Sequence, residues 1–319
     1  MQAGKTLTVS KELIGPPGTW NPTLFMFLIS LSLLGLAVGG YGWWLWPRWL
    51  VFFTNLLALH LAGTVIHDAC HNSAHPNRIV NAALGHGAAL MLGFVFPVFT
   101  RVHIQHHAHV NDPDNDPDYY VSHGGPLWLI APRFFYHEVY FFQRRLWRKF
   151  ELLEWFLSRA ILIGTVYTCI QIGWWHYFIT YWGIPLMIVG YALGLFFDYL
   201  PHRPFVERHR WRNARVYPSA VLNVLILGQN YHLIHHLWPS IPWYLYQRGY
   251  HEAKPLLEAH GSPQCLGILE SRKALWSFVY DLFLGIHLPH RSQASADTAP
   301  ALKVVDPTEP NDTEQQIAA

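Results

Sequence analysis

The chain has 319 residues, of which 51% are hydrophobic, 16% aromatic and only 13% charged. This composition is apolar for a soluble protein, and the 15 tryptophans fit a chain that lines two membrane interfaces. The formal net charge of +2 says little by itself, and we expect no nucleic-acid partner. The 3 cysteines are an odd number without pair spacing, so no disulfide framework is expected.

The two ends of the chain differ from its middle. Residues 1–20 are polar and predict a polar N-terminal segment rather than a signal peptide. Residues 286–319 are mostly small and polar, without periodic apolar positions, and predict a disordered tail. Residues 21–285 are predicted to form one membrane domain.

Four segments of the middle region are long and apolar enough to cross a membrane, which takes about 20 residues. The first two, 24–46 and 49–66, form a helical hairpin with a turn at Pro47 and Arg48. The other two are 152–172 and 178–200. The fold class predicted is therefore all-α, with four transmembrane helices.

A fifth apolar segment, 79–99, is interrupted by Asn81, His86, Gly87 and Pro97. If it crossed the membrane, the histidines on its two sides would face opposite compartments. We therefore expect it to lie in the membrane interface, or to dip in and out.

Three histidine clusters follow apolar segments: HDACH (67–71), HIQHH (103–107) and HLIHH (232–236). In a helix, residues three and four apart share a face, so each cluster presents two or three imidazoles in one direction. Asp198 and His202 have the same spacing at the end of the fourth span. One zinc ion takes four ligands, so nine histidines predict two metal ions with positions left for water or oxygen. The predicted ligands are His67, His71, His103, His106, His107, His202, His232, His235 and His236, with Asp198 as a further ligand or a group that holds water.

Other polar residues near the clusters carry a weaker signal. His75 and His109 extend two of the cluster faces and are less favoured as ligands, and His60 and His86 fit hydrogen-bonded core positions better. His137 and the remaining scattered histidines have no partner spacing. The acidic run 111–118 is either a solvated turn or a set of carboxylates that hold the far N–H of ligating imidazoles or pair with arginines on the same side of the membrane. Asp68 could act likewise.

Positive charge gives an orientation. The segments on the histidine side of the membrane hold the basic residues Arg78, Arg101, Arg133, Arg144, Arg145, Arg148, Lys149, Arg203, Arg208, Arg210, Arg212 and Arg215. The two short opposite turns hold only Arg48. Because cytoplasmic loops carry an excess of Lys and Arg, we expect the histidines and both termini to face the cytoplasm, as a His-rich catalytic cap.

The spacing of imidazoles does not separate iron from zinc. A polynuclear site at the membrane surface implies a lipid-soluble substrate, and two irons suit O₂ activation better than hydrolysis does. No unit for a nicotinamide, flavin or haem is recognisable, so electrons are expected from another protein.

Four motifs resemble those of known enzymes: IHDACHNSAH (66–75), FPVFTRVHIQHH (96–107), FFDYLPHRP (196–204) and GQNYHLIHHLWPSIP (228–242). Their order and placement resemble the membrane fatty acid desaturase/hydroxylase superfamily. Within it they are similar to the cyanobacterial-type β-carotene hydroxylases, over roughly residues 20–260.

The resemblance implies a di-iron monooxygenase that uses O₂ to hydroxylate carbon 3 of β-ionone rings, converting β-carotene through cryptoxanthin to zeaxanthin. It implies the nine histidines as iron ligands and a ferredoxin as electron donor. In the acyl-desaturase branch an amide stands four residues before the lone histidine, whereas this chain has Asp198, which leaves the role of that residue open.

Three alternatives remain. A β-carotene 4-ketolase or an acyl-lipid desaturase would use the same metal cage, since the shape of the cavity decides between them. A His-rich metal transporter is more distant, because its ligands would stand at mid-membrane depth.

Overall fold

A computed structural model describes residues 9–287 and contains, within them, helices and loops but no β-strand. The predicted all-α class is confirmed. The predicted tail lies outside the described residues, except for its first two positions. Of the N-terminal segment, Lys11–Ile14 forms the short helix α1, and its Leu13 is only 1% exposed against Trp211 and Ile241.

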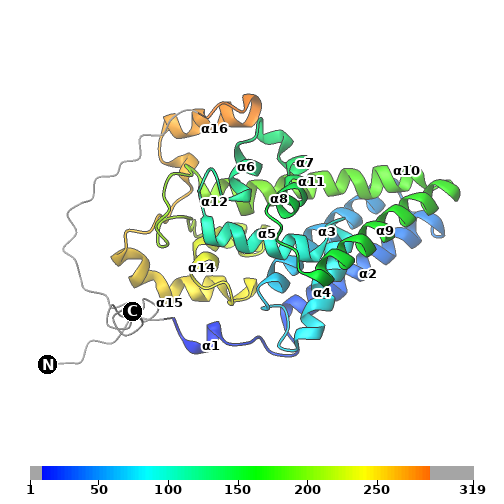
Figure 1. Ribbon diagram of the computed structural model, residues 1–319, viewed down its shortest axis with the longest axis horizontal. Coiled ribbons are helices and arrows are strands. Elements are labelled where there is room, and N and C mark those ends of the chain that lie inside the picture. The colour runs from blue at the N-terminus through cyan, green and yellow to red at the C-terminus, as the bar shows by residue number, and fades with distance from the viewer. Residues whose placement is uncertain (1–8, 288–319) are drawn as a thin grey trace.

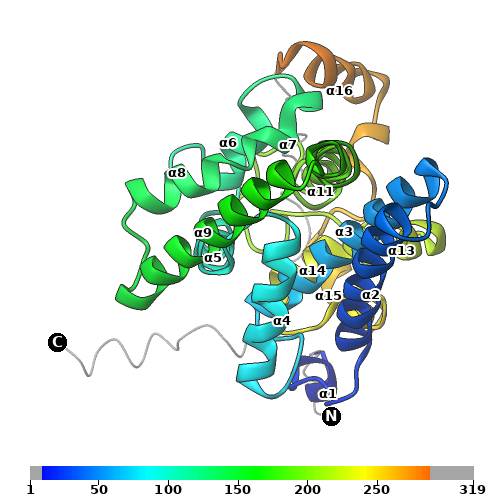
Figure 2. The ribbon, with the colours of Figure 1, turned by 90° about the vertical axis from the view of Figure 1, so that its right-hand side faces the viewer.

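Within residues 9–287, four helices are long and apolar enough to span a membrane, as predicted: α2 (Pro22–Gly42), α3 (Arg48–Cys70), α9 (Lys149–Gln171) and a continuous helix over Trp175–His202. They run side by side toward one end of the molecule, and the shorter helices gather at the other end (Figures 1 and 2). No side chain of α9 is buried, as expected for a helix whose surroundings are lipid.

Local sequence explains where these helices begin and bend. Asn21 caps α2 by accepting a hydrogen bond from the backbone N–H of Leu24, and Pro22 stands at the first helical position. The fourth span contains two π-helical turns, η2 (Phe178–Gly183) and η3 (Gly194–Tyr199), each two residues before a proline. A proline offers no N–H to the preceding turn, so the helix widens at these points.

The fourth span is completed by α10 (Trp175–Tyr177), α11 (Ile184–Leu193) and α12 (Leu200–His202). Helix α3 extends four residues beyond the predicted span, so His67 lies within its last turn.

The doubtful fifth segment forms two helices, α4 (Arg78–Met91) and α5 (Phe96–His109), which meet at an angle of 100°. Gly93 at the bend has φ +67°, a conformation that favours glycine. The sharp bend agrees with a segment that dips in and out rather than crossing as one straight helix.

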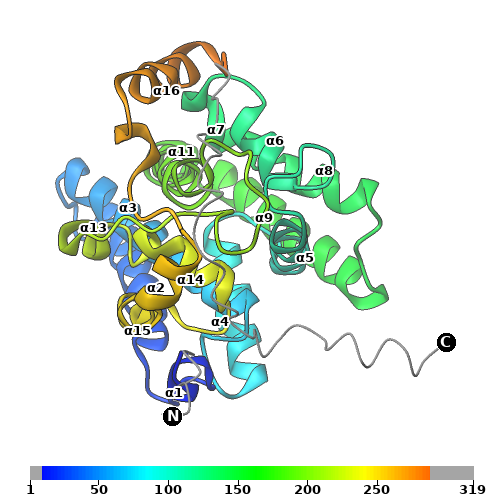
Figure 3. The ribbon, with the colours of Figure 1, turned by 90° about the vertical axis from the view of Figure 1, so that its left-hand side faces the viewer.

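The remaining helices lie toward the other end of the molecule, some of them against the sides of the long helices. They are α6 (Pro117–His123), α7 (Ile130–Arg133), α8 (Tyr136–Gln143), α13 (Ala220–Leu225), α14 (His232–Leu237), α15 (Tyr246–Ala259) and α16 (Arg272–Leu284). Figure 3 views the molecule from this end. The buried Leu233 and Ile234 of α14 pack against Tyr246 and Tyr250 of α15, which fixes the helix that carries the third histidine cluster.

Candidate metal centre

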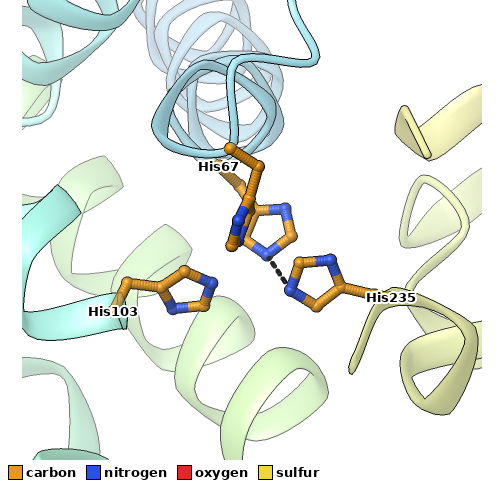
Figure 4. A group of neighbouring side chains, drawn as sticks. His67, His103 and His235 are labelled. Atoms are coloured by element: carbon orange, nitrogen blue, oxygen red, sulfur yellow. Dashed lines mark hydrogen bonds between the residues drawn. The ribbon is translucent and has the colours of Figure 1, made fainter. Parts of the chain in front are cut away.

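All nine predicted histidines come together at one end of the bundle, eight of them in two groups of four. The nitrogens of each group lie within 4.8 Å of one another, which is close enough for each group to hold one metal ion. Figure 4 shows that His67, His103 and His235 reach the first group from three different elements. The first group is His67, His71, His103 and His235, and the second is His106, His202, His232 and His236.

The ninth histidine stands between the groups. His107 Nε2 lies 3.1 Å from His103 Nε2 and 2.9 Å from His235 Nε2, and its ring centroid is 4.4 Å from that of His236. It therefore borders both groups.

Helical spacing explains how each element presents its ligands. His67 and His71 are four residues apart at the end of α3, and His103 and His107 are four apart on α5. His232, His235 and His236 occupy one short helix, α14. The last ligand position, His202, ends the fourth span at α12.

The outward ring nitrogens of four of these histidines are held by other groups. His202 Nδ1 donates to the carbonyl of Asn213 at 3.0 Å, and His106 Nδ1 donates to Asp116 Oδ1 at 2.9 Å. His232 Nδ1 donates to Gln229 Oε1 at 3.2 Å. His235 Nδ1 lies 3.0 Å from the hydroxyl of Tyr246, whose pKa is raised by burial, so that it is a neutral phenol. Such outer contacts orient imidazoles at metal sites.

The Nε2 atoms, which face one another inside the site, show whether the residues fit a metal ion. With Nδ1 donating outward, the neutral rings of His202 and His232 both point a lone pair from Nε2 at each other, 3.1 Å apart. Two lone pairs at this distance repel, and neither nitrogen has a proton to share. A cation between the rings removes the conflict, so the residues fit metal ions bound through imidazole nitrogens.

The acidic run divides between the two alternatives. Asp116 is buried, caps α6 and holds His106, and Asp118 Oδ1 accepts from His137 Nε2 at 2.7 Å. In contrast, Asp112 pairs with the exposed Arg208 at the surface, where Asp114 is also exposed. Two of the four carboxylates therefore reach the metal centre.

Asp68 does not contact an imidazole. Its carboxylate accepts hydrogen bonds from the Thr23 hydroxyl at 2.7 Å and from the Trp243 backbone N–H at 3.3 Å. The idea that Asp68 holds a ligating histidine was wrong, because the side chain turns away from the cluster face and ties α3 to α2.

The weaker histidines lie outside both groups. His75 Nδ1 accepts from the Asn77 backbone N–H at 3.0 Å, and His60 Nε2 lies 3.0 Å from the Leu225 carbonyl. His109 belongs to neither group. His137 is also buried beside the site. No spacing in the sequence singled it out, because its partner Asp118 comes from another helix.

A pocket opens beside the first histidine group. Four of the histidines, His67, His103, His106 and His232, form part of its lining. The rest is largely apolar and comes from α3, the bend between α4 and α5, the first turn of α5, Phe134 and the fourth span. Asp198, which is 5% exposed and belongs to neither histidine group, also faces this pocket.

Comparisons with known proteins agree with this architecture. A family model described as "Fatty acid desaturase" matches residues 19–266. The beta-carotene ketolase of Paracoccus sp. (strain PC1) is 32% identical over 245 residues, which are 72% of this chain and 93% of that protein. The beta-carotene ketolase of Paracoccus sp. (strain N81106 / MBIC 01143) is 36% identical over 187 residues, 56% of this chain and 69% of that protein. The sn-1 oleoyl-lipid 12-desaturase of Arthrospira platensis is 26% identical over 256 residues, 68% of this chain and 70% of that protein. Because the family match spans most of the chain and the first of these relatives is covered almost throughout, this chain belongs, as its motifs predicted, to the fatty acid desaturase family.

Proposed function

We propose that the protein is a di-iron monooxygenase that hydroxylates carbon 3 of the β-ionone rings of carotenoids, taking β-carotene through cryptoxanthin to zeaxanthin. One observation carries the proposal: two groups of imidazole nitrogens meet beside an apolar pocket at the end of membrane-spanning helices. A lipid-soluble ring can enter such a pocket directly from the bilayer. The four motifs that resemble β-carotene hydroxylases support carbon 3 as the position.

Different residues of the chain have different roles in this reaction. The nine histidines would hold two iron ions, which when bound supply the activation of O₂ by two external electrons. Aromatic side chains of the pocket, such as Phe99 and Phe197, exclude water from the ring. Gly63, one turn before His67, leaves room for the ring next to the first histidine group.

A β-carotene 4-ketolase is the second candidate, because two of the most similar relatives are named beta-carotene ketolase. It would oxidise the neighbouring ring carbon with the same cage. An acyl-lipid desaturase is the third, with support from more distant relatives.

Pigment analysis separates these candidates. The chain is produced in a host that accumulates β-carotene, and the pigments are resolved by chromatography. We expect cryptoxanthin and zeaxanthin. Canthaxanthin would instead assign the ketolase activity, and unchanged pigment would refute oxidation of the ring. His235→Ala is expected to abolish product while the protein still inserts, whereas His109→Ala, outside both histidine groups, keeps it.

The electron donor is proposed to be an acidic ferredoxin, attracted by exposed basic residues. Two of the basic residues on the histidine side, Arg203 and Arg215, are only 3% and 7% exposed and contact Asp281 and Glu270, so they are not available for docking. The surface left for docking is therefore Arg208, Arg210 and Arg212, or the run from Arg144 to Lys149, which also suits anionic lipid.

Charge reversal tests this face. Arg210→Glu combined with Arg212→Glu should raise the ferredoxin concentration needed for half-maximal turnover, with iron content unchanged. The matched pair Arg144→Glu and Arg145→Glu tests the other run. Unchanged kinetics in both pairs would remove the docking proposal.

A further inference from the structure

The pocket beside the histidines has an apolar wall and a polar end. Its wall is formed by Ile66, Leu92, Phe94, Phe99, Phe134, Leu193 and Phe197. The polar side chains other than the histidine groups are Asp118, His137 and Asp198. A carotenoid ring without oxygen would need only the wall.

Two of these three polar side chains have partners within the protein. Asp118 Oδ1 accepts from His137 Nε2 at 2.7 Å, and Asp118 Oδ2 lies 3.5 Å from His106 Nδ1. Asp118 and His137 therefore already have partners next to the metal centre.

Asp198 is different. It is 5% exposed and faces the pocket, yet its Oδ2 has no hydrogen-bond partner among the described residues. The nearby Arg133 makes no hydrogen bond to it, since its Nε and Nη1 donate to the carbonyls of Val121 and Pro126, at 2.6 and 2.7 Å, and its Nη2 has no partner among the described residues. A buried oxygen that can accept a hydrogen bond and does not is costly, so a ligand that donates to it gains affinity.

Resting on the proposed function, we infer that Asp198 is the subsite for a hydroxyl group on the bound ring. The ligand class is a cyclohexenyl ring that carries one hydroxyl, as the product ring of the proposed hydroxylation does. The O–H of the ring donates to Asp198 Oδ2, while the rest of the ring lies against the apolar wall. An unoxidised ring leaves this oxygen without a partner.

The position of Asp198 in the helix suits this role. It lies in the π-helical turn η3, four residues before His202, so a carboxylate and a histidine of the second group leave the same helix end. One helical turn is about 5.4 Å, which a six-membered ring and its substituent can bridge. The hydroxylated product ring can therefore lie beside the histidines while its hydroxyl reaches Asp198.

Binding of two ring analogues tests the inference without turnover. The metal-containing protein in lipid nanodiscs is dialysed against β-ionone or 3-hydroxy-β-ionone, and uptake by empty nanodiscs is subtracted. After this correction we expect the wild type to bind the hydroxylated ring roughly tenfold more tightly, the value of about one hydrogen bond to a buried acceptor. Asp198→Leu should bring the ratio of the two affinities close to one, while Asp198→Asn, which keeps an accepting oxygen, retains most of it.

Phe197→Leu is the matched control, since it alters the neighbouring apolar wall. It should weaken the binding of both rings alike and leave their ratio unchanged. An unchanged ratio in Asp198→Leu would overturn the inference, and so would loss of iron from that variant, which would make Asp198 a metal ligand. Failure of the wild type to bind either ring would instead refute the proposed function itself.

Discussion

At the scale of single residues, the metal centre depends on which ring nitrogen carries the proton. Asp116, Gln229 and the carbonyl of Asn213 each accept from an outward Nδ1, which leaves Nε2 free to bind a cation. These partners are as much a part of the site as the histidines. The chain places them in three separate loops or helix ends.

Asp116 provides the sharpest test of this arrangement. Asp116→Ala leaves His106 without its outer acceptor, so the affinity for iron should fall by about 10- to 100-fold. The measurement is the concentration of chelator that removes half of the iron from purified protein. Asp114→Ala, an exposed position in the same loop, should behave like the wild type. Equal chelator midpoints for both variants would contradict the role given to Asp116.

At the scale of elements, the contact between α3 and α11 shapes the pocket. A Cβ added at Gly63 would stand 3.0 Å from both terminal methyls of Leu193, and both residues line the pocket. The glycine is therefore required by space rather than by its backbone conformation. A change at Gly63 can therefore alter the pocket without altering the metal centre.

Enlarging this glycine should remove product without removing metal. We expect Gly63→Leu to lose most of its product in the pigment assay while its iron content stays near that of the wild type, because no histidine is altered. Gly164→Leu on the lipid-facing helix α9, where nothing lies within 4 Å of the added Cβ, is the control and should keep activity. Normal yields from Gly63→Leu would mean that the ring binds elsewhere.

Helix α16 is tied to the end of the fourth span by a buried group of charges. Asp281 contacts Tyr199 and Arg203, and its Oδ1 accepts from His287 Nδ1 at 3.0 Å. The hydrogen bond to Asp281 raises the pKa of His287. Burial alone would raise the pKa of Asp281, but the bonds from His287 and Tyr199 and the charge of Arg203 lower it overall.

These shifts predict a pH dependence with a definite sign. The raised pKa of His287 means that its stabilising contribution is complete below its unfolded value, about 6.5, and is lost as the pH rises through the folded value. The thermal unfolding midpoint of the wild type should therefore fall more between about pH 6 and about pH 9 than that of His287→Gln. Identical pH profiles would show that the ion pair contributes nothing. The contribution of Asp281 has the opposite sense and is lost only in acid, as the pH falls through its lowered folded value.

At the scale of the whole molecule, the proposed reaction requires both histidine groups to be on one side of the membrane. The ends of α3, α5 and the fourth span meet there, while the α2–α3 turn and the start of the fourth span lie at the other end of the long helices (Figure 1). The excess of basic residues on the histidine side supports a cytoplasmic location.

Single cysteines and a membrane-impermeant thiol reagent test this orientation. In a background without the three native cysteines, Asn72→Cys and Ile104→Cys should react only from the cytoplasmic side. Leu45→Cys, which is exposed in the α2–α3 turn, should react only from the opposite side. Labelling of residues 72 and 104 from opposite sides of the membrane would contradict a metal site shared by the two histidine groups.

The sequence by itself predicted the four spans and singled out the nine histidines as candidate metal ligands, because both are local patterns. About 20 apolar residues make a span whatever surrounds them, and ligands three or four apart share a helix face in any fold. The bend between α4 and α5 could also be expected, from Pro97 and the polar interruptions of the segment.

Only the tertiary structure decided which other groups serve the site. The contacts of Asp118 with His137, and of His235 with Tyr246, join different helices, and no periodicity encodes them. The same holds for Arg203 and Arg215, which look like surface charges in the sequence but are buried against Asp281 and Glu270. Burial and hydrogen bonding across helices depend on how the elements pack, and packing also left Asp198 facing the pocket without a partner.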